Sequence, residues 1–514
     1  MTQTEALTIL KTGKNVFVTG AAGSGKTFVV NQYIKYLKDH YLPVGITAST
    51  GIAATHMGGV TIHSWSGIGV SDKLSDFEIE GIAEKKYIKK KIEAARVLII
   101  DEVSMLHHFR LDMVHRVLQK IKKSDEPFGG LQVVLCGDFF QLPPIARYGE
   151  PQSRFIYESK SWKEGMFTVC YLGDNYRQVN DPSLNILNDI RAGEVSEQSY
   201  ELLMSRSSKL KVLSQKSEVA SHKPQVLGSK SENATDDEAG DNSNETAEET
   251  ISTKLYTHNI DVDSINNAEL TKMDGYETTY EMTSRGKKPL VETLKKSCLA
   301  PEVLKLKKGA RVMCVKNNFD EGYVNGTLGV VLSCGYGVDP IIQTSSTPDH
   351  PSGQRITVSR ATWAIEDDGK TLAELTQYPL RLAWAITVHK SQGMSLDSVE
   401  VDLSKSFEPG MGYVALSRVR TLKGLTILGI NENALRVNPL VLEYDRHLKE
   451  MSGKAESIIQ HTDSREIERA QKEFLASAAA LHSMKKSKES AYKFPKQEKT
   501  TKKNKWSKWG RGGY

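Results

Sequence analysis

The chain has 514 residues, of which 39% are hydrophobic and 25% charged, and its formal net charge is +5. These values are typical of globular proteins and exclude a wholly disordered, collagen-like or coiled-coil chain, and the length predicts roughly three domains. The charge is uneven, because residues 484–514 carry a net +9 and residues 231–250 a net −8, so the rest of the chain is close to neutral.

The chain shows no sign of membrane insertion or secretion. No apolar run reaches the roughly 18 residues of a spanning helix, and the start MTQTEALTIL does not resemble a signal peptide. We expect no membrane partner and a cytoplasmic location in a bacterium or virus, or a nuclear or mitochondrial one in a eukaryote. The five cysteines include no C-x-x-C pair, which argues against a disulfide framework or a zinc ribbon.

Short Val- and Ile-rich runs alternate with helical patterns in the first 160 residues. The runs are NVFVTG (15–20), PVGITAST (43–50), ARVLIIDE (95–102) and LQVVLCGD (131–138). Strands that are apolar on both faces are typical of a parallel sheet covered by helices. The pattern predicts an α/β domain over residues 1–160, with a small insertion near 65–92.

The sequence GAAGSGKT (20–27) fits the phosphate-loop pattern G-x-x-x-x-G-K-[ST] and lies between a predicted strand and an amphipathic helix. Glycines let the backbone N–H groups surround a polyphosphate, and the helix N-terminus adds positive potential. In this pattern Lys26 contacts the outer phosphates and the Thr27 hydroxyl binds Mg²⁺. We expect the nucleotide to contact Gly20, Ala21, Ala22, Gly23, Ser24, Gly25, Lys26, Thr27 and Phe28.

Two further strand ends carry polar groups suited to phosphate chemistry. Asp101 and Glu102 end a buried strand, where the first can hold Mg²⁺ and the second can orient or deprotonate the attacking water. Gln141, in GDFFQLPP (137–144), is a neutral amide that can sense a γ-phosphate. Taken alone, the segment around Gln141 is equally well explained as a turn that ends a strand.

A second region with strands and helices begins near Phe167 and includes KLYTHNIDVDSIN (254–266), AWAITVHKSQG (383–393) and LTILGI (425–430), without a phosphate loop of its own. Residues 207–251 are polar and acidic, which predicts a disordered insertion. Residues 325–378 predict a small β module. A charged helix and a basic, aromatic tail occupy 441–514.

Seven motifs, in this order, resemble those of the Pif (petite integration frequency) family, superfamily 1B DNA helicases related to RecD. They are GAAGSGKT, TASTGIAATHMGGVTIHS (47–64), IIDEVSM (99–105), PFGGLQVVLCGDFFQLPP (127–144), DNYRQ (174–178), AWAITVHKSQGMSLD (383–397) and GYVALSRVR (412–420). The similarity covers about residues 1–435 apart from the insertion. LKKGARVMCVKNN (306–318) and VNGT (324–327) resemble the approach to that family's SH3-like module.

The resemblance implies an α/β fold of two RecA-like P-loop domains with parallel sheets and with ATP in the cleft between them. The first is residues 1–160; the second combines 161–206, 252–324 and 379–440, and 325–378 forms the SH3-like β module. It also implies an ATP- and Mg²⁺-dependent helicase that moves 5′ to 3′ on single-stranded DNA, or on DNA with a 5′ overhang, in replication, repair, recombination or telomere maintenance.

The resemblance also assigns roles to individual residues. Gln3 reads adenine, Asp101 holds the metal together with Thr27, and Glu102 acts on the attacking water. Gln141 contacts the γ-phosphate, and two arginines, Arg177 and Arg418, reach the nucleotide from the second domain. Residues on the DNA-binding face are His63, Ser64, Thr387, His389 and Lys390.

Alternatives remain open from the sequence. The chain could be a RecD-like subunit of a larger complex, or a nucleotide-gated DNA-binding factor that does not unwind. A small-molecule P-loop kinase is disfavoured because it has no need of the second-domain arginines. The tail interleaves lysines with aromatic residues, which suits either stacking on unpaired bases or solubility alone. We expect a monomer, and the sequence identifies no protein partner.

Overall fold

The computed structural model describes residues 1–69, 72–144, 154–174, 181–207, 253–256, 262–318, 320–323, 325–344, 353–367, 370–388, 391–392 and 394–491. Most of the acidic insertion (207–251) and the end of the basic tail (492–514) lie outside these ranges, as do Arg177, His389 and Lys390. None of the described helices is both long and apolar enough to cross a membrane.

The first domain is built on a parallel six-stranded sheet with the order β3-β2-β4-β5-β1-β6. Its strands are β1 (Val16–Gly20), β2 (Val44–Ala48), β3 (Val60–Thr61), β4 (Val97–Asp101), β5 (Gln132–Cys136) and β6 (Thr168–Leu172). Every residue of β1, β4 and β5 is buried, because helices cover both faces of the sheet. The predicted parallel sheet is confirmed for this domain.

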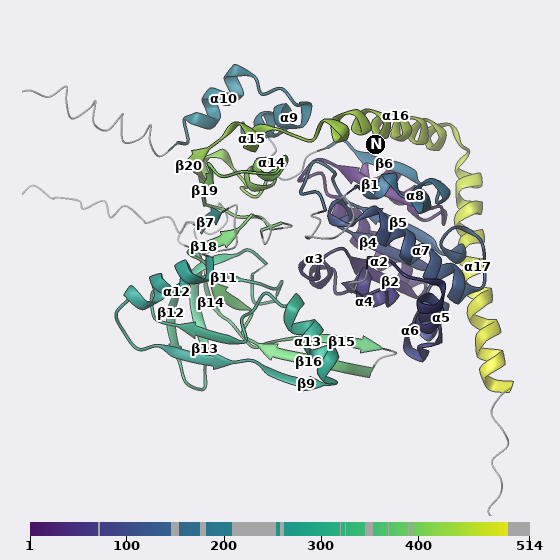
Figure 1. Ribbon diagram of the computed structural model, residues 1–514, viewed down its shortest axis with the longest axis horizontal. Coiled ribbons are helices and arrows are strands. Elements are labelled where there is room, and N and C mark those ends of the chain that lie inside the picture. The colour runs from purple at the N-terminus through teal and green to yellow at the C-terminus, as the bar shows by residue number, and fades with distance from the viewer. Residues whose placement is uncertain are drawn as a thin grey trace, which may run out of the picture.

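Helices surround this sheet on both faces (Figure 1). They are α1 (Gln3–Leu10), α2 (Lys26–Asp39), α3 (Gly51–His56), α4 (Ile62–Ser66), α5 (Asp76–Glu84), α6 (Lys86–Ala94), α7 (His108–Lys122) and α8 (Lys160–Glu164), with 3₁₀ turns η1 (Val103–Met105), η2 (Pro127–Gly130) and η3 (Ile156–Glu158). The insertion expected near 65–92 is a helical pair, since α5 and α6 pack on each other and on α7.

The second domain contains a parallel four-stranded sheet with the order β18-β7-β19-β20. Its strands are β7 (Thr253–Tyr256), β18 (Ala385–Thr387), β19 (Val399–Leu403) and β20 (Leu425–Ile430). Its helices are α9 (Ser183–Ala192), α10 (Glu197–Met204), α12 (Val262–Lys272), α14 (Met411–Leu416) and α15 (Glu432–Leu435), with the 3₁₀ turn η4 (Leu422–Gly424). A second parallel α/β unit is therefore present, as the sequence predicts.

Antiparallel sheets form a third region, which lies beside the second domain in Figure 1. Its strands are β8 (Thr278–Glu281), β9 (Thr283–Gly286), β10 (Val303–Leu306), β11 (Arg311–Cys314), β12 (Leu328–Gly335), β13 (Val338–Thr344), β14 (Arg355–Thr357), β15 (Ala361–Asp367), β16 (Lys370–Gln377) and β17 (Leu380–Leu382). Its helix is α13 (Lys288–Ser297).

The antiparallel region is larger than the module predicted at 325–378. β9 pairs with β16, and β11 pairs with both β12 and β17, so strands before residue 325 and after residue 378 belong to the same sheets. The predicted extent of the second domain over 252–324 therefore needs correction. Pairing between strands far apart in sequence sets this boundary, and local patterns do not report it.

The boundary at residue 160 also differs from the prediction. β6, within the segment assigned to the second domain, pairs along its whole length with β1 and forms the edge of the first sheet. Its register places Thr168 beside Val16 and Leu172 beside Gly20. The first domain thus extends at least to Leu172.

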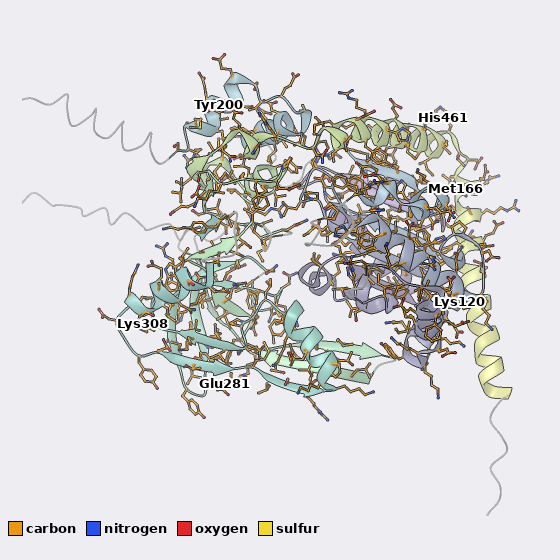
Figure 2. All side chains as sticks on the ribbon, viewed as in Figure 1. Lys120, Met166, Tyr200, Glu281, Lys308 and His461 are labelled. Atoms are coloured by element: carbon orange, nitrogen blue, oxygen red, sulfur yellow. The ribbon has the colours of Figure 1, made fainter. Side chains whose placement is uncertain are left out.

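Two long helices, α16 (Pro439–His461) and α17 (Ser464–Ala491), follow the second domain. α16 crosses to the first domain and packs on β6, and α17 runs along its side (Figure 1). His461 marks the turn between them (Figure 2). Gln471 donates to the Thr8 carbonyl, and Gln460 donates to Glu5, so the C-terminal helices are bonded to α1.

Gln132, the first residue of β5, connects the sheet to α1 and α2 through its side chain. Its side-chain amide donates to the carbonyls of Leu10 (2.9 Å) and Lys14 (2.7 Å) and accepts a hydrogen bond from the Tyr33 hydroxyl (2.6 Å). Gln132 is buried, and its bonds to Leu10 and Tyr33 are buried as well, while the bond to Lys14 is partly buried. The amide therefore fixes α1 and α2 to the sheet.

Replacing Gln132 with Leu should lower the free energy of unfolding by about 2–4 kcal/mol, because buried polar partners are left unpaired. Thermal unfolding measures the change. Gln119→Leu is the control, since the Gln119 side chain makes its hydrogen bonds at the exposed end of α7. The unfolding temperature of this variant should be close to that of the wild type. A Gln132→Leu protein that unfolds at the wild-type temperature would contradict this role.

Candidate functional site: a nucleotide cleft between two domains

The phosphate loop connects β1 to α2 with a backbone that needs glycine at several places. Gly20, Gly23 and Gly25 have φ values of 145°, 88° and 84°, which residues with a side chain rarely adopt. A Cβ on Gly20 would also lie 2.7 Å from the Leu172 carbonyl oxygen. Gly25 forms the N-cap of α2, so the helix N-terminus opens directly into the loop, as expected for a phosphate site.

Side chains of the loop have the chemistry of a polyphosphate site. The Lys26 Nζ donates to the carbonyls of Gly20 (2.9 Å) and Ala21 (3.0 Å), which places the ammonium group against the loop. The Ser24 hydroxyl is buried and has no hydrogen-bond partner in the part of the chain that is described. Thr27 and Phe28 are exposed on the first turn of α2. These groups fit a bound nucleotide.

Asp101 and Glu102 lie at the carboxyl end of β4, on the edge of the sheet that carries the phosphate loop. Asp101 is the last residue of the strand, and Glu102 follows in a left-handed conformation with φ of 51°. Burial, followed by the negative charge of Asp101, raises the pKa of Glu102 to about 7. A carboxylate with such a pKa is suited to accept a proton from an attacking water.

The donor set at this edge suits Mg²⁺. Magnesium prefers oxygen ligands and usually takes only one or two from the protein, with phosphates and water supplying the others. The Thr27 hydroxyl and the Asp101 carboxylate are the residues that would hold it. Among the described residues, no three His, Cys, Asp or Glu side chains form a cluster for a tightly chelated metal.

Gln392, between β18 and β19, brings the second domain into this site. Its Nε2 donates to the Glu102 carboxylate (2.9 Å) and to the Gln141 side-chain oxygen (3.2 Å). Both of these acceptors belong to the first domain, and both were predicted from their motifs. Gln392 was not predicted as a site residue, although it follows Lys390 in the quoted motif. No local pattern distinguishes it from a packing residue.

Arg418 is 2% exposed and lies within the second domain. Its guanidinium donates to the Val414 carbonyl (2.9 Å) and to the Ser417 hydroxyl (2.8 Å). Its positive charge lowers the pKa of Glu102 in part, against the larger effects of burial and Asp101. Arg418 is thus close enough to influence the Glu102 carboxylate, and these two hydrogen bonds hold it to its own domain.

Gln3, at the start of α1, donates to the Ser24 carbonyl at 3.2 Å, which places it beside the phosphate loop. A cavity of about 500 Å³ opens near this point, lined by both domains and α16. Residues from its walls include Ala21, Gly173, Asn188, Arg191, Lys449 and Glu456. This cavity borders the phosphate loop at Ala21, but Lys26, Thr27 and Asp101 are not among its lining residues, so it does not outline the expected nucleotide site.

The proposed DNA contacts are placed less uniformly. His63 and Ser64 are partly buried in α4, and burial, with the nearby charges of Arg110 and His107, lowers the pKa of His63 to about 4. His63 is therefore neutral at physiological pH. Thr387 is fully buried in β18, so its side chain packs within the second domain and does not lie at the surface expected for a DNA contact.

Comparison with known proteins identifies relatives over most of the chain. The family model for PIF1-like helicases matches residues 3–200, and the model for the 2B domain of DNA helicase Pif1 matches residues 289–333. The second match begins before residue 325, in agreement with the larger antiparallel region. An ATP-dependent DNA helicase Pif1 from Psychrobacter is 39% identical, covering 94% of this chain and 76% of the relative.

Solved structures give the same result. Bacteroides Pif1 in complex with ADP-AlF4 is 30% identical with a TM-score of 0.69, covering 87% of this chain and 96% of that one. Bacteroides Pif1 bound to single-stranded DNA has the same identity and coverage, with a TM-score of 0.54. With its phosphate loop, its two parallel-sheet domains and these relatives, the chain belongs to the PIF1-like helicase family.

Proposed function

We propose that this ATP-dependent DNA helicase moves 5′ to 3′ along single-stranded DNA and unwinds duplexes that carry a 5′ overhang. Its family relatives are ATP-dependent DNA helicases, and one related structure has single-stranded DNA bound. The direction rests on the motif resemblance. Replication, repair, recombination and telomere maintenance are the processes in which such an activity would act, with the protein as a monomer.

One contact supports motor activity most directly, namely the bond from Gln392 to Glu102 and Gln141 across the domain boundary. Glu102 acts on the attacking water and Gln141 faces the γ-phosphate, so the second domain touches both catalytic groups of the first. Movement of one domain relative to the other would change their positions. Hydrolysis is then coupled to domain motion, which is the requirement for translocation.

The residues of the chain divide the chemical work. Lys26 and the loop N–H groups bind the phosphates, and Glu102 accepts the proton of the attacking water at its carboxylate. Gln392 orients Glu102. Mg²⁺, when bound through Thr27 and Asp101, supplies charge neutralisation on the phosphate oxygens.

Two alternatives predict different behaviour. A RecD-like subunit would unwind only with partner proteins. A nucleotide-gated DNA-binding factor would hydrolyse ATP slowly and would not unwind. The interdomain contact of Gln392 favours the motor over the gated factor, since it connects the catalytic carboxylate itself to the second domain.

ATPase rates should rise strongly on addition of single-stranded DNA, and duplexes with a 5′ tail should be unwound in preference to those with a 3′ tail. Steady-state ATPase assays and strand-displacement assays measure these properties. Absence of stimulation would rule out the motor, and unwinding only from a 3′ tail would reverse the proposed direction.

Lys26→Ala should reduce the ATPase rate by at least about 100-fold, because it removes the cation that stabilises charge on the transferring phosphoryl group. Binding of a fluorescent single-stranded oligonucleotide should remain within a few-fold of wild type. ATPase activity retained by this variant would refute the role assigned to the phosphate loop.

Gln392→Ala should lower the DNA-stimulated kcat by about 10- to 100-fold, because Glu102 loses the donor that orients it. The affinity for single-stranded DNA should change little. Gln119→Ala is the matched control, since the hydrogen bonds of the Gln119 side chain within the described ranges go to the carbonyls of Asp125 and Glu126 at the far end of α7. Equal kcat values for the two variants would show that Gln392 has no part in hydrolysis.

A further inference from the structure

A buried ion pair joins the two domains close to the phosphate loop. Arg191, in the last turn of α9, donates from Nη1 to both carboxylate oxygens of Asp138, at 2.7 and 2.8 Å. The two side chains are 9% and 1% exposed. Asp138 belongs to the first domain, in the segment after β5, so this pair crosses the domain boundary. None of the roles assigned above uses it.

Asp138 holds the turn that presents Gln141. The Gln141 N–H donates to the Asp138 carbonyl (3.0 Å), and the Phe140 N–H donates to its carboxylate (3.2 Å). The Arg191 guanidinium lies over the Phe140 ring, 4.1 Å from its centroid. Arg191 of the second domain therefore contacts this turn at two points, the Asp138 carboxylate and the Phe140 ring. The position of the Gln141 amide depends on the same turn.

Tyr413, on α14 of the second domain, connects the pair to the phosphate loop. Its hydroxyl donates to Asp138 (3.2 Å) and accepts from Arg191 (3.0 Å) and from the backbone N–H of Ala22 (2.9 Å). A phenol has one proton to donate and two lone pairs to accept with, so all its hydrogen-bonding capacity is used. Ala22 is part of the loop that surrounds the phosphates.

The remaining donors of Arg191 point toward α16 and β6. Nη2 donates to the Tyr171 hydroxyl (2.7 Å) and lies 3.7 Å from Asp445. Tyr171 in turn donates to Asp445 (2.9 Å). The guanidinium is thus enclosed by groups from four parts of the chain, namely the segment after β5, α14, β6 and α16, and its planar set of donors is matched to them. A lysine has no such fork of donors.

The charges support one another in this buried setting. Burial alone would raise the pKa of Asp138, but the positive charges of Arg191 and Lys26 more than offset it, and the pKa lies below the usual range. Both partners are therefore charged, and the removal of either would leave the other buried without its closest opposite charge, with only the more distant Asp445 or Lys26 to offset it.

From these contacts we propose that Arg191 is a positioning residue of the ATPase, which sets the Gln141 turn and the Ala22 segment of the phosphate loop from the second domain. It acts through Asp138 and through the Tyr413 hydroxyl. Both phosphate-facing segments then take their catalytic positions only while the two domains are engaged. The proposal rests on the DNA-stimulated ATPase proposed above.

The close packing of α14 against the same turn agrees with this role. Gly410, the N-cap of α14, has φ of 91°, and a Cβ there would lie 2.8 Å from the Phe140 carbonyl oxygen. The start of α14 therefore lies directly on the turn that Arg191 holds. Because this contact is close, a small shift of the second domain would also displace Phe140 and Gln141.

The test uses the full chain with Arg191→Lys and Tyr413→Phe, which keep the charge and the ring respectively. The basal ATPase rate, the rate at saturating single-stranded DNA and the thermal midpoint are measured for each. The ATPase rate of the wild-type protein must rise on addition of single-stranded DNA. If it does not, the proposed motor function is refuted, and the role of Arg191 is a separate question. Arg436→Lys is the control, since Arg436 is exposed and pairs only with Glu432 among the described residues.

We expect Arg191→Lys to lower the DNA-stimulated kcat at least ten-fold and to bring the ratio of stimulated to basal rates toward one, with oligonucleotide affinity within about two-fold. Tyr413→Phe should show the same change to a smaller degree, and Arg436→Lys should match wild type. A purely structural role would lower basal and stimulated rates in parallel with the thermal midpoint. That result, or an unchanged ratio in both variants, would overturn the proposal.

Arg191→Met combined with Asp138→Asn removes both charges and covers the case in which the single substitution does not fold. This variant leaves no isolated buried charge, so it should fold and bind the oligonucleotide. Its stimulated-to-basal ratio should nevertheless remain near one. Normal stimulation in this folded protein would also contradict the assignment.

Discussion

The structure depends on the burial of charged groups at the boundary between its two parallel-sheet domains. A charge removed from water must be paired or hydrogen-bonded, or the fold loses stability. Asp138 of the first domain is buried and Glu102 is half-buried, and each receives a partner from the second, Arg191 and Gln392 respectively. These contacts offset the cost of removing the two carboxylates from water. They also make the positions of the groups that act on ATP depend on how the two domains are arranged.

This arrangement explains why the catalytic groups lie where they do. The phosphate loop and Asp101 lie at the carboxyl edge of one parallel sheet, where successive strands end together. The second sheet has no phosphate loop in the described residues, and its contribution is a set of side chains that reach across. The C-terminal helices then tie the second domain to α1 and β6, on either side of the loop.

Much of the site was predictable because its motifs are contiguous. The glycines of 20–27 and the pair Asp101–Glu102 lie at or just after the end of a buried strand, so a local pattern identifies both the residues and their place on the sheet. Gln141 lies farther from the end of β5, and its segment alone was equally well explained as a turn. The two parallel sheets follow from runs that are apolar on both faces. The position of ATP between two domains and the roles of individual residues were predicted from the resemblance to a helicase family, because composition alone does not indicate them.

The sequence failed where distant segments determine the outcome. Gln392 and Arg191 look like ordinary polar residues until the fold places them against Glu102 and Asp138. Thr387 has a residue type suited to a phosphate contact, yet β18 buries it. The boundary of the antiparallel region was misplaced because β9 and β11 find their partners about 70 to 90 residues later in the chain.

Coupling between domain motion and ATP hydrolysis is tested most directly by the distance between the two domains during the ATPase cycle. Spin labels at Lys163 and Lys423, exposed positions in the first and second domains, would report it in the free protein, with single-stranded DNA, and with DNA plus ADP and aluminium fluoride. We expect the distance distribution to change between these states and to narrow in the last. A distribution that is identical in all three states, in a protein whose ATPase is stimulated by DNA, would contradict this coupling.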